Sequence, residues 1–137
     1  MASEVLIDTS GFYAILVRGD DRHSEAARFL QRASVNKQRF VTTDYIVDET
    51  ATLLQARGLA DLTSRLFETI SASKACKLIW MDSDLFVRTR ALFLKNLGRG
   101  WSFTDCMSFA VMKALHLEEA LTKDSHFQDA GFRAILI

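Results

Sequence analysis

The chain has 137 residues, of which 49% are apolar, and it carries 17 basic and 17 acidic side chains. This length and composition fit a single domain, spanning residues 1–137, that can bury a sizeable core. The formal net charge of zero argues against a protein that holds nucleic acid by bulk positive charge, but not against one that uses a metal ion and a local basic patch.

The two cysteines and the hydropathy pattern exclude two further classes. Cys76 and Cys106 are too few for a disulfide framework, so we expect buried thiols in a cytoplasmic protein. No apolar run approaches the ~20 residues that span a bilayer, and the N-terminus lacks the pattern of a secretory signal. A membrane protein is therefore not expected.

Short apolar runs alternate with segments of helical periodicity along the whole chain. Strands are predicted at residues 5–7, 40–42, 77–81, 120–122 and 132–137. Helices are predicted at residues 12–17, 23–38, 44–56, 62–75, 82–97 and 103–116. This alternation predicts an α/β fold with a mainly parallel sheet covered on both faces. Only about nine residues separate the last two strands, so a short helical turn or a change of strand direction is expected there.

Four acidic residues are expected at one edge of this sheet. Asp8 follows the first predicted strand, and Asp124 follows the fourth. Helices return antiparallel to the strands, so their first turns lie at the same edge, and this places Asp105 and Glu49 there as well. Each acid alone also has a structural explanation as a helix cap, a helix-dipole partner or a turn residue.

Two adjacent acids, Asp48 and Glu49, lie in the third predicted helix, and only one of them is needed for the site. Glu49 shares the apolar face of its helix with Ile46 and Leu53, whereas Asp48 lies on a polar face. An acid on a buried face is costly unless it is paired or binds a cation, so Glu49 is favoured.

Asp82 and Asp84 follow the third predicted strand and compete for the same edge. Their simpler interpretation is as the cap and first-turn acid of the next helix.

Clustered carboxylates repel one another and raise one another's pKa, and a hard divalent cation relieves that repulsion. No histidine or cysteine cluster has the spacing of a zinc site, so a site made of oxygen ligands is expected. Mg²⁺ is held by such ligands beside substrate phosphates and supports phosphodiester hydrolysis.

Four segments resemble, in order and spacing, the motifs of PIN domains, and most closely those of the VapC toxins of type II toxin–antitoxin pairs and their stand-alone relatives. The segments are LIDTSGFYAIL, YIVDETATLL, WSFTDCMSFAVM and ALTKDSHFQDAGF. The resemblance covers nearly the whole chain.

The resemblance implies a sheet in the order 3-2-1-4-5 and an endoribonuclease that depends on Mg²⁺ or Mn²⁺. It implies that the catalytic and metal-binding acids are Asp8, Glu49, Asp105 and Asp124. Ser10 and Thr104 match positions that support the site by hydrogen bonding. The implied partners are the RNA substrate, an antitoxin protein and a second copy of the chain.

An RNA substrate needs positive charge beyond the metal. The candidates are Arg99, Lys123 and His126, and each has the alternative of a solvated surface charge. Trp101 is expected either to stack on a base or, with better support, to pack into the core.

Three other functions are compatible with parts of the pattern. The first is a PIN-like ribonuclease in RNA processing or decay, which would use the same site chemistry. The second is a module that binds a cation or a protein without catalysis. The third is a phosphatase or receiver-like domain, which would leave Glu49 and Asp105 unexplained.

Overall fold

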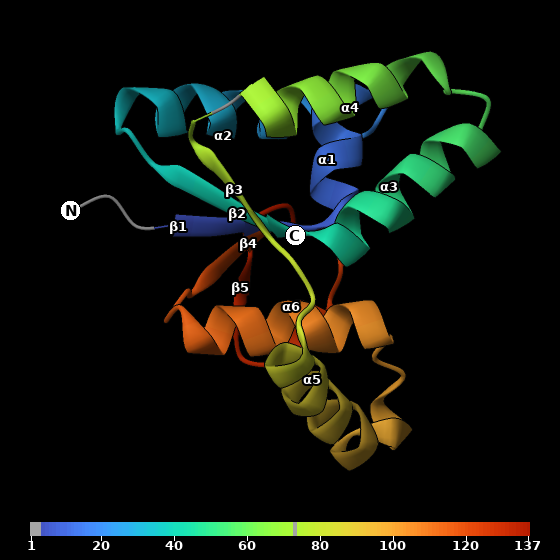
Figure 1. Cartoon of the computed structure of the whole chain (residues 1–137). Coiled ribbons are helices and arrows are strands. Elements are labelled where there is room, and N and C mark those ends of the chain that lie inside the picture. The colour runs from blue at the N-terminus through green and yellow to red at the C-terminus, as the bar shows by residue number, and fades with distance from the viewer. Residues whose placement is uncertain (1–3, 73) are drawn as a thin grey trace.

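The computed structural model describes residues 4–72 and 74–137, which form a five-stranded sheet with helices on both faces (Figure 1). The strands are β1 (Glu4–Ile7), β2 (Arg39–Thr43), β3 (Cys76–Ile79), β4 (Glu119–Leu121) and β5 (Arg133–Ala134). Their order is β3-β2-β1-β4-β5 and all neighbouring pairs are parallel, which confirms the expected fold class. Receiver-like domains instead place the first strand beside the third, so this topology disfavours that function.

The helices form one layer on each side of the sheet. They are α1 (Thr9–Leu16), α2 (His23–Val35), α3 (Asp44–Ala56), α4 (Asp61–Ala72), α5 (Ser83–Lys95), α6 (Phe103–Ala114) and α7 (His126–Asp129), with a 3₁₀ turn η1 (Leu97–Arg99). Helices α1 to α4 lie on one face, and α5 and α6 on the other (Figure 1). The short α7 provides the expected turn between β4 and β5, and within the described ranges no helix is long and apolar enough to cross a membrane.

Several predicted boundaries were wrong by a few residues. The strand predicted at 77–81 ends at Ile79, because Trp80 turns out to solvent and the Met81 N–H donates to the Asp44 carboxylate (3.1 Å). The strand predicted at 132–137 is only two residues long. Helix α1 begins at Thr9 and not at Phe12. The helix predicted at 62–75 ends at Ala72, and residue 73 lies outside the described residues.

The core has one apolar layer on each face of the sheet. Phe12, Ile46, Leu54 and Leu66 are fully buried on α1, α3 and α4. On the other face Phe109 of α6 is the centre of an aromatic cluster, with its ring centroid 5.0 Å from Trp101, 5.0 Å from Phe127 and 5.8 Å from Phe132. Trp101 is 9% exposed, so it packs into the core, as expected, and is not free to stack on a base.

Gly11 allows α1 to lie against the end of β4. A Cβ atom at this position would stand 2.1 Å from the backbone oxygen of Leu121 and 3.2 Å from the Ile7 side chain. A backbone oxygen in a paired strand cannot move away cheaply, so only glycine fits this contact. The close approach brings Thr9 and Ser10 beside the residues that follow β4.

Gly11→Ala is expected to lower the free energy of unfolding by about 2 kcal/mol, because an overpacking cost of about 3 kcal/mol outweighs the ~1 kcal/mol that alanine gains over glycine in a helix. Urea unfolding followed by circular dichroism measures this change. Gly19→Ala is the control, since nothing lies within 4 Å of a Cβ built there. Equal stability of the two variants would show that the contact between α1 and β4 is not tight.

Candidate active site

Asp8 stands at the carboxyl end of the central strand β1, between β2 and β4. It is only 5% exposed, and its backbone N–H donates to Leu121 O (3.2 Å). Although Asp8 is the N-cap residue of α1, its side chain makes no capping hydrogen bond. The capping explanation therefore does not account for this carboxylate.

The environment of Asp8 disfavours its negative charge. Burial raises the pKa of Asp8 from 3.8 to about 7, the Thr122 hydroxyl opposes the shift, and the charges of Asp105 and Glu49 add to it. A carboxylate that is ionised here at neutral pH needs a compensating positive charge. The protein provides no basic side chain in contact with it among the described hydrogen bonds and ion pairs.

A chain of hydroxyl groups joins Asp8 to the segment after β4. The fully buried Thr122 donates its hydroxyl to Asp8 Oδ2 (2.9 Å) and accepts from the Asp124 N–H (3.0 Å). The single Thr122 hydroxyl proton is donated to Asp8, so in the contact between Thr122 and Ser10 (3.1 Å) the Ser10 hydroxyl is the donor. Ser10 in turn accepts from the backbone N–H of Lys123 (2.8 Å). Ser10 thus occupies the supporting position implied by the resemblance, and Thr122 was missed from the sequence.

Asp105, Asp124 and His126 form a compact group of possible metal ligands. One ligand atom from each lies within 4.8 Å of the others. His126 Nδ1 lies 3.0 Å from Asp105 Oδ2 and 3.4 Å from Asp124 Oδ1. Burial lowers the pKa of His126, but the hydrogen bond to Asp105 and the neighbouring carboxylate charges outweigh it and raise the pKa overall. His126 was expected to contact RNA, whereas its ring lies against the site acids.

Asp105 is also the third residue of a capping box at the start of α6. Ser102 Oγ accepts from the Asp105 N–H (2.9 Å), and Asp105 Oδ2 accepts from the Ser102 N–H (3.1 Å). These bonds hold one carboxylate oxygen and leave Oδ1 without a partner among the described hydrogen bonds. Thr104 lines the neighbouring hollow and makes no described side-chain hydrogen bond to the site, so its supporting role stays a prediction.

Glu49 reaches the site from α3, although not for the reason given by the sequence. The prediction that it lies on a buried face was wrong, because the buried face of α3 is Ile46, Thr50 and Leu54 and Glu49 is exposed. Its carboxylate Oε1 accepts from the Thr9 hydroxyl (2.5 Å). Glu49 lines the same hollow as Asp8, whereas Asp48 does not.

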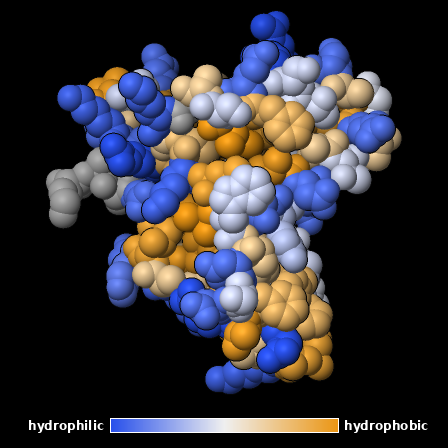
Figure 2. Space-filling view, viewed as in Figure 1, coloured by the Kyte–Doolittle hydropathy of each residue, from blue (hydrophilic) through white to orange (hydrophobic). Residues whose placement is uncertain are grey.

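Two hollows meet at Thr9 and Glu49. One, of about 270 Å³, is lined by three of the four acids, Asp8, Glu49 and Asp124. The other, of about 790 Å³, runs along α3 and reaches Thr104 before α6. Figure 2 shows the surface hollowed between α3 and the α5–α6 pair, so an extended ligand has room beside the acids.

The smaller hollow has cationic and aromatic walls that the sequence did not reveal. Arg57 and Tyr13 line it, and the Arg57 guanidinium lies 4.9 Å from the centre of the Tyr13 ring. Stacking on tyrosine restricts the arginine without neutralising its charge. Arg57 follows the last turn of α3, two turns from Glu49, and that helical spacing was the available signal.

The other basic candidates do not point freely at the acids. Lys123 Nζ lies 2.9 Å from both Asp20 and Asp21, so it anchors the loop between α1 and α2 beside the site. Arg99 lies over the Trp101 ring, at 5.1 Å from its centre, next to a separate hollow. Their contact with RNA remains a prediction.

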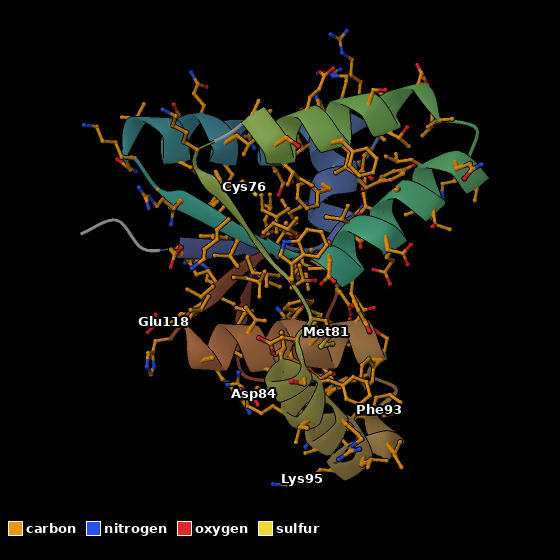
Figure 3. All side chains as sticks on the ribbon, in the orientation of Figure 1. Cys76, Met81, Asp84, Phe93, Lys95 and Glu118 are labelled. Atoms are coloured by element: carbon orange, nitrogen blue, oxygen red, sulfur yellow. The ribbon has the colours of Figure 1, made fainter. Side chains whose placement is uncertain are left out.

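Asp82 and Asp84 lie apart from the site, as expected. Strand β3 is at the sheet margin, and Asp82 caps α5 by accepting from the Leu85 N–H (2.8 Å). Figure 3 shows Asp84 in the first turn of α5, where it is exposed.

Comparison with known proteins gives a consistent family. The sequence model of the PIN domain matches residues 5–133. The chain is 28% identical over 128 residues to the 23S rRNA-specific endonuclease VapC20 of Mycobacterium tuberculosis, covering 93% of this chain and 95% of that protein. It is 28% identical over 124 residues to the VapC ribonuclease of Archaeoglobus fulgidus, covering 89% and 78% of the two chains. The crystal structure of VapC20, titled a Sarcin-Ricin loop cleaving toxin, superposes with a TM-score of 0.81 over 93% of this chain and 95% of that one.

The raised pKa of Asp8 predicts a pH-dependent stability in the absence of metal. The native state binds this proton more tightly than the unfolded state, so the stability from Asp8 is present below pH 4 and is lost as pH rises through about 7. Asp8→Asn should therefore stabilise the protein in EDTA by about 2 kcal/mol more at pH 8 than at pH 5.

Urea unfolding at the two pH values measures this difference, with the exposed Asp48→Asn as the control. A gain that is the same at both pH values would mean that Asp8 ionises normally in the folded protein.

Proposed function

The chain belongs to the PIN domain family, and we propose that it is an endoribonuclease that hydrolyses RNA phosphodiester bonds with a bound Mg²⁺ or Mn²⁺ ion. The observation that carries the proposal is the convergence of Asp8, Glu49, Asp105 and Asp124 at one edge of the sheet, with Asp8 buried at a raised pKa. The names of the relatives describe RNA cleavage, which supports RNA as the substrate here. We propose residues 1–137 as one PIN-like domain.

The donor set fits a hard divalent cation. The acids present carboxylate oxygens, and the charges of Asp105 and Glu49 add to the penalty on ionised Asp8. A cation removes that penalty, and oxygen ligands at a partly hydrated site suit Mg²⁺ or Mn²⁺. We assign Asp8, Glu49 and Asp105 as the principal holders of the ion, with Asp124 completing the set.

When bound, the ion lowers the pKa of a water molecule and stabilises charge on the phosphodiester. The protein's own groups position the reactants. The Asp124 carboxylate orients the attacking water, and its Oδ1 is held by a hydrogen bond from the backbone N–H of His126 (2.9 Å). The water oxygen then adds to phosphorus as the bond to the 3′ oxygen breaks. The water loses a proton to solvent and the 3′ oxygen takes one up, which leaves 5′-phosphate and 3′-hydroxyl ends. Arg57 at the rim of the hollow binds a non-bridging phosphate oxygen.

We propose that the enzyme acts as the toxin of a toxin–antitoxin pair in the cytoplasm. One relative, VapC20, is described as a toxin that cleaves the Sarcin-Ricin loop. The two cysteines, Cys76 and Cys106, are free thiols, as is common in a reducing compartment. The apolar side chains exposed on α5, Phe86, Val87 and Leu94, are suited to contact an antitoxin or a second copy of the chain. A neighbouring antitoxin gene would separate this function from RNA processing by the same chemistry.

Asp8→Asn and Glu49→Gln are each expected to lower the rate of RNA cleavage by at least about 10²-fold, because each removes a charge that holds the ion. EDTA should abolish cleavage, and Mg²⁺ or Mn²⁺ should restore it. The measurement is cleavage of a mixed RNA pool by purified protein, resolved on a denaturing gel.

Asp84→Asn is the control, since it neutralises an exposed acid of α5 that lines neither hollow beside the site and should keep nearly full activity. Cleavage that survives in both Asp8→Asn and Glu49→Gln would refute the assigned site. Cleavage that survives in EDTA would refute metal dependence.

Thr122→Val removes the hydroxyl that joins Asp8 to Asp124 while keeping the shape of the side chain. Such supporting bonds commonly contribute 10–100-fold, so cleavage should weaken by about that factor and require more Mg²⁺ for half-maximal rate. A metal titration of the initial rate measures both effects. Unchanged metal dependence would mean that Thr122 has a packing role alone.

A further inference from the structure

A third hollow, distinct from the two beside the acids, is lined by residues of α5, η1 and α6. It has a volume of about 250 Å³, and its polar walls are Lys95, Asn96, Arg99, Trp101 and Lys113. The three cations come from the last residue of α5, from η1 and from the last turn of α6. No acidic side chain lines this hollow, so its charge has a single sign.

These three cations are free to bind a ligand. All three side chains are exposed, and none takes part in the ion pairs of residues 4–72 and 74–137. Lys123, in contrast, is already held by Asp20 and Asp21. Figure 3 shows Lys95 at the far end of α5 from Met81, where its charge faces solvent.

The donors of this hollow suit an oxyanion. Lysine and arginine side chains carry donors and no acceptor, and the indole N–H is also only a donor. The Trp101 Nε1 is buried and has no hydrogen-bond partner in the described part of the chain. The volume is below the ~300–1,000 Å³ of typical small-molecule sites, so it is better matched to a phosphate group than to a whole nucleotide.

The position of the hollow connects it with the acids. Lys113 follows Asp105 by eight residues on the same helix, which is about 12 Å along the axis of α6. Arg99 and Trp101 belong to the segment that leads directly into the first turn of α6. A polyanion that places one phosphate at Asp105 can therefore place a nearby phosphate at the cations.

We propose that Lys95, Arg99 and Lys113 form a phosphate-binding exosite that holds the RNA backbone away from the scissile bond. This inference rests on the proposed ribonuclease function, and it extends that function to substrate selection. RNA that is long enough to contact both the exosite and the hollow lined by Asp8, Glu49 and Asp124 binds more tightly than a short strand that occupies that hollow alone.

The test compares two triple variants with the same change of net charge. Lys95→Gln/Arg99→Gln/Lys113→Gln removes the exosite, and Arg28→Gln/Arg32→Gln/Arg39→Gln removes three exposed cations of α2 and β2. Both are made with Asp8→Asn, so that RNA is bound and not cut, and thermal melting checks their folding. Fluorescence anisotropy measures binding of a labelled RNA of about 30 nucleotides over a range of KCl concentrations.

The exosite variant should bind this RNA at least about tenfold more weakly, and the slope of log affinity against log salt should fall by about 2, as expected for three lost phosphate contacts. The α2–β2 variant should stay within about threefold of the parent. With Asp8 restored, both variants should cleave a tetranucleotide at the parental rate. The double variant Lys95→Gln/Lys113→Gln provides the same test without changing the contact of Arg99 with Trp101.

Equal loss of binding in the two triple variants would show an effect of bulk charge and would overturn the exosite. So would unchanged binding, or an equal loss of tetranucleotide cleavage in the exosite variant. If the exosite variant loses RNA binding while the parent shows no metal-dependent cleavage, the exosite stands and the proposed ribonuclease function fails.

Discussion

The cost of burying the Asp8 carboxylate at the centre of the sheet edge governs the rest of the site. A charge at that depth is unfavourable unless it is matched. The surroundings supply hydrogen bonds from the Thr122 hydroxyl and the Thr9 backbone, together with further negative charge from Asp105 and Glu49. The charges around Asp8 are therefore not balanced by the described side chains, and the cation that we propose would balance them. Catalytic groups are often held in such unfavourable environments, because the same features that weaken the free protein strengthen its hold on the ligand.

The strand order, a helix packing contact and a helix cap together hold Asp8 and its neighbouring acids in place. The order β3-β2-β1-β4-β5 gives β1 a neighbour on each side, so that Asp8 is shielded from water and close to the segment after β4. Gly11 lets α1 approach β4 closely enough for Ser10 to bond with Thr122. The capping box of Ser102 and Asp105 fixes the third acid by bonds that also begin α6. Local helix chemistry and site geometry thus use the same side chains.

Much of this was accessible from the sequence, for reasons that can be stated. Alternating apolar runs and helical segments predict a parallel sheet, and a parallel sheet gathers strand ends and helix starts at one edge, which is how Asp8, Asp105 and Asp124 were identified together. The residues that were missed act across elements. Thr122 matters because of the strand beside it, which no linear pattern shows. The spacing of Arg57 from Glu49 can be read from the sequence, but its contact with the Tyr13 ring cannot. Glu49 was predicted from an apolar helix face, but its side chain is exposed. The spacing of residues along a helix shows which side chains share a face, but not how deeply that face is buried.

The hydrogen bond between Asp8 and Thr122 joins residues 114 positions apart. The pairing of β1 with β4 that creates this bond is among the most non-local contacts of the chain, and forming such contacts costs loop-closure entropy and slows folding. During synthesis on the ribosome, a growing chain that lacks β4 has neither Thr122 nor Asp124 and cannot assemble the full set of acids. The four acids of the proposed site therefore come together only after β4 has joined the sheet, so the order in which the strands emerge also sets the order in which the site is assembled.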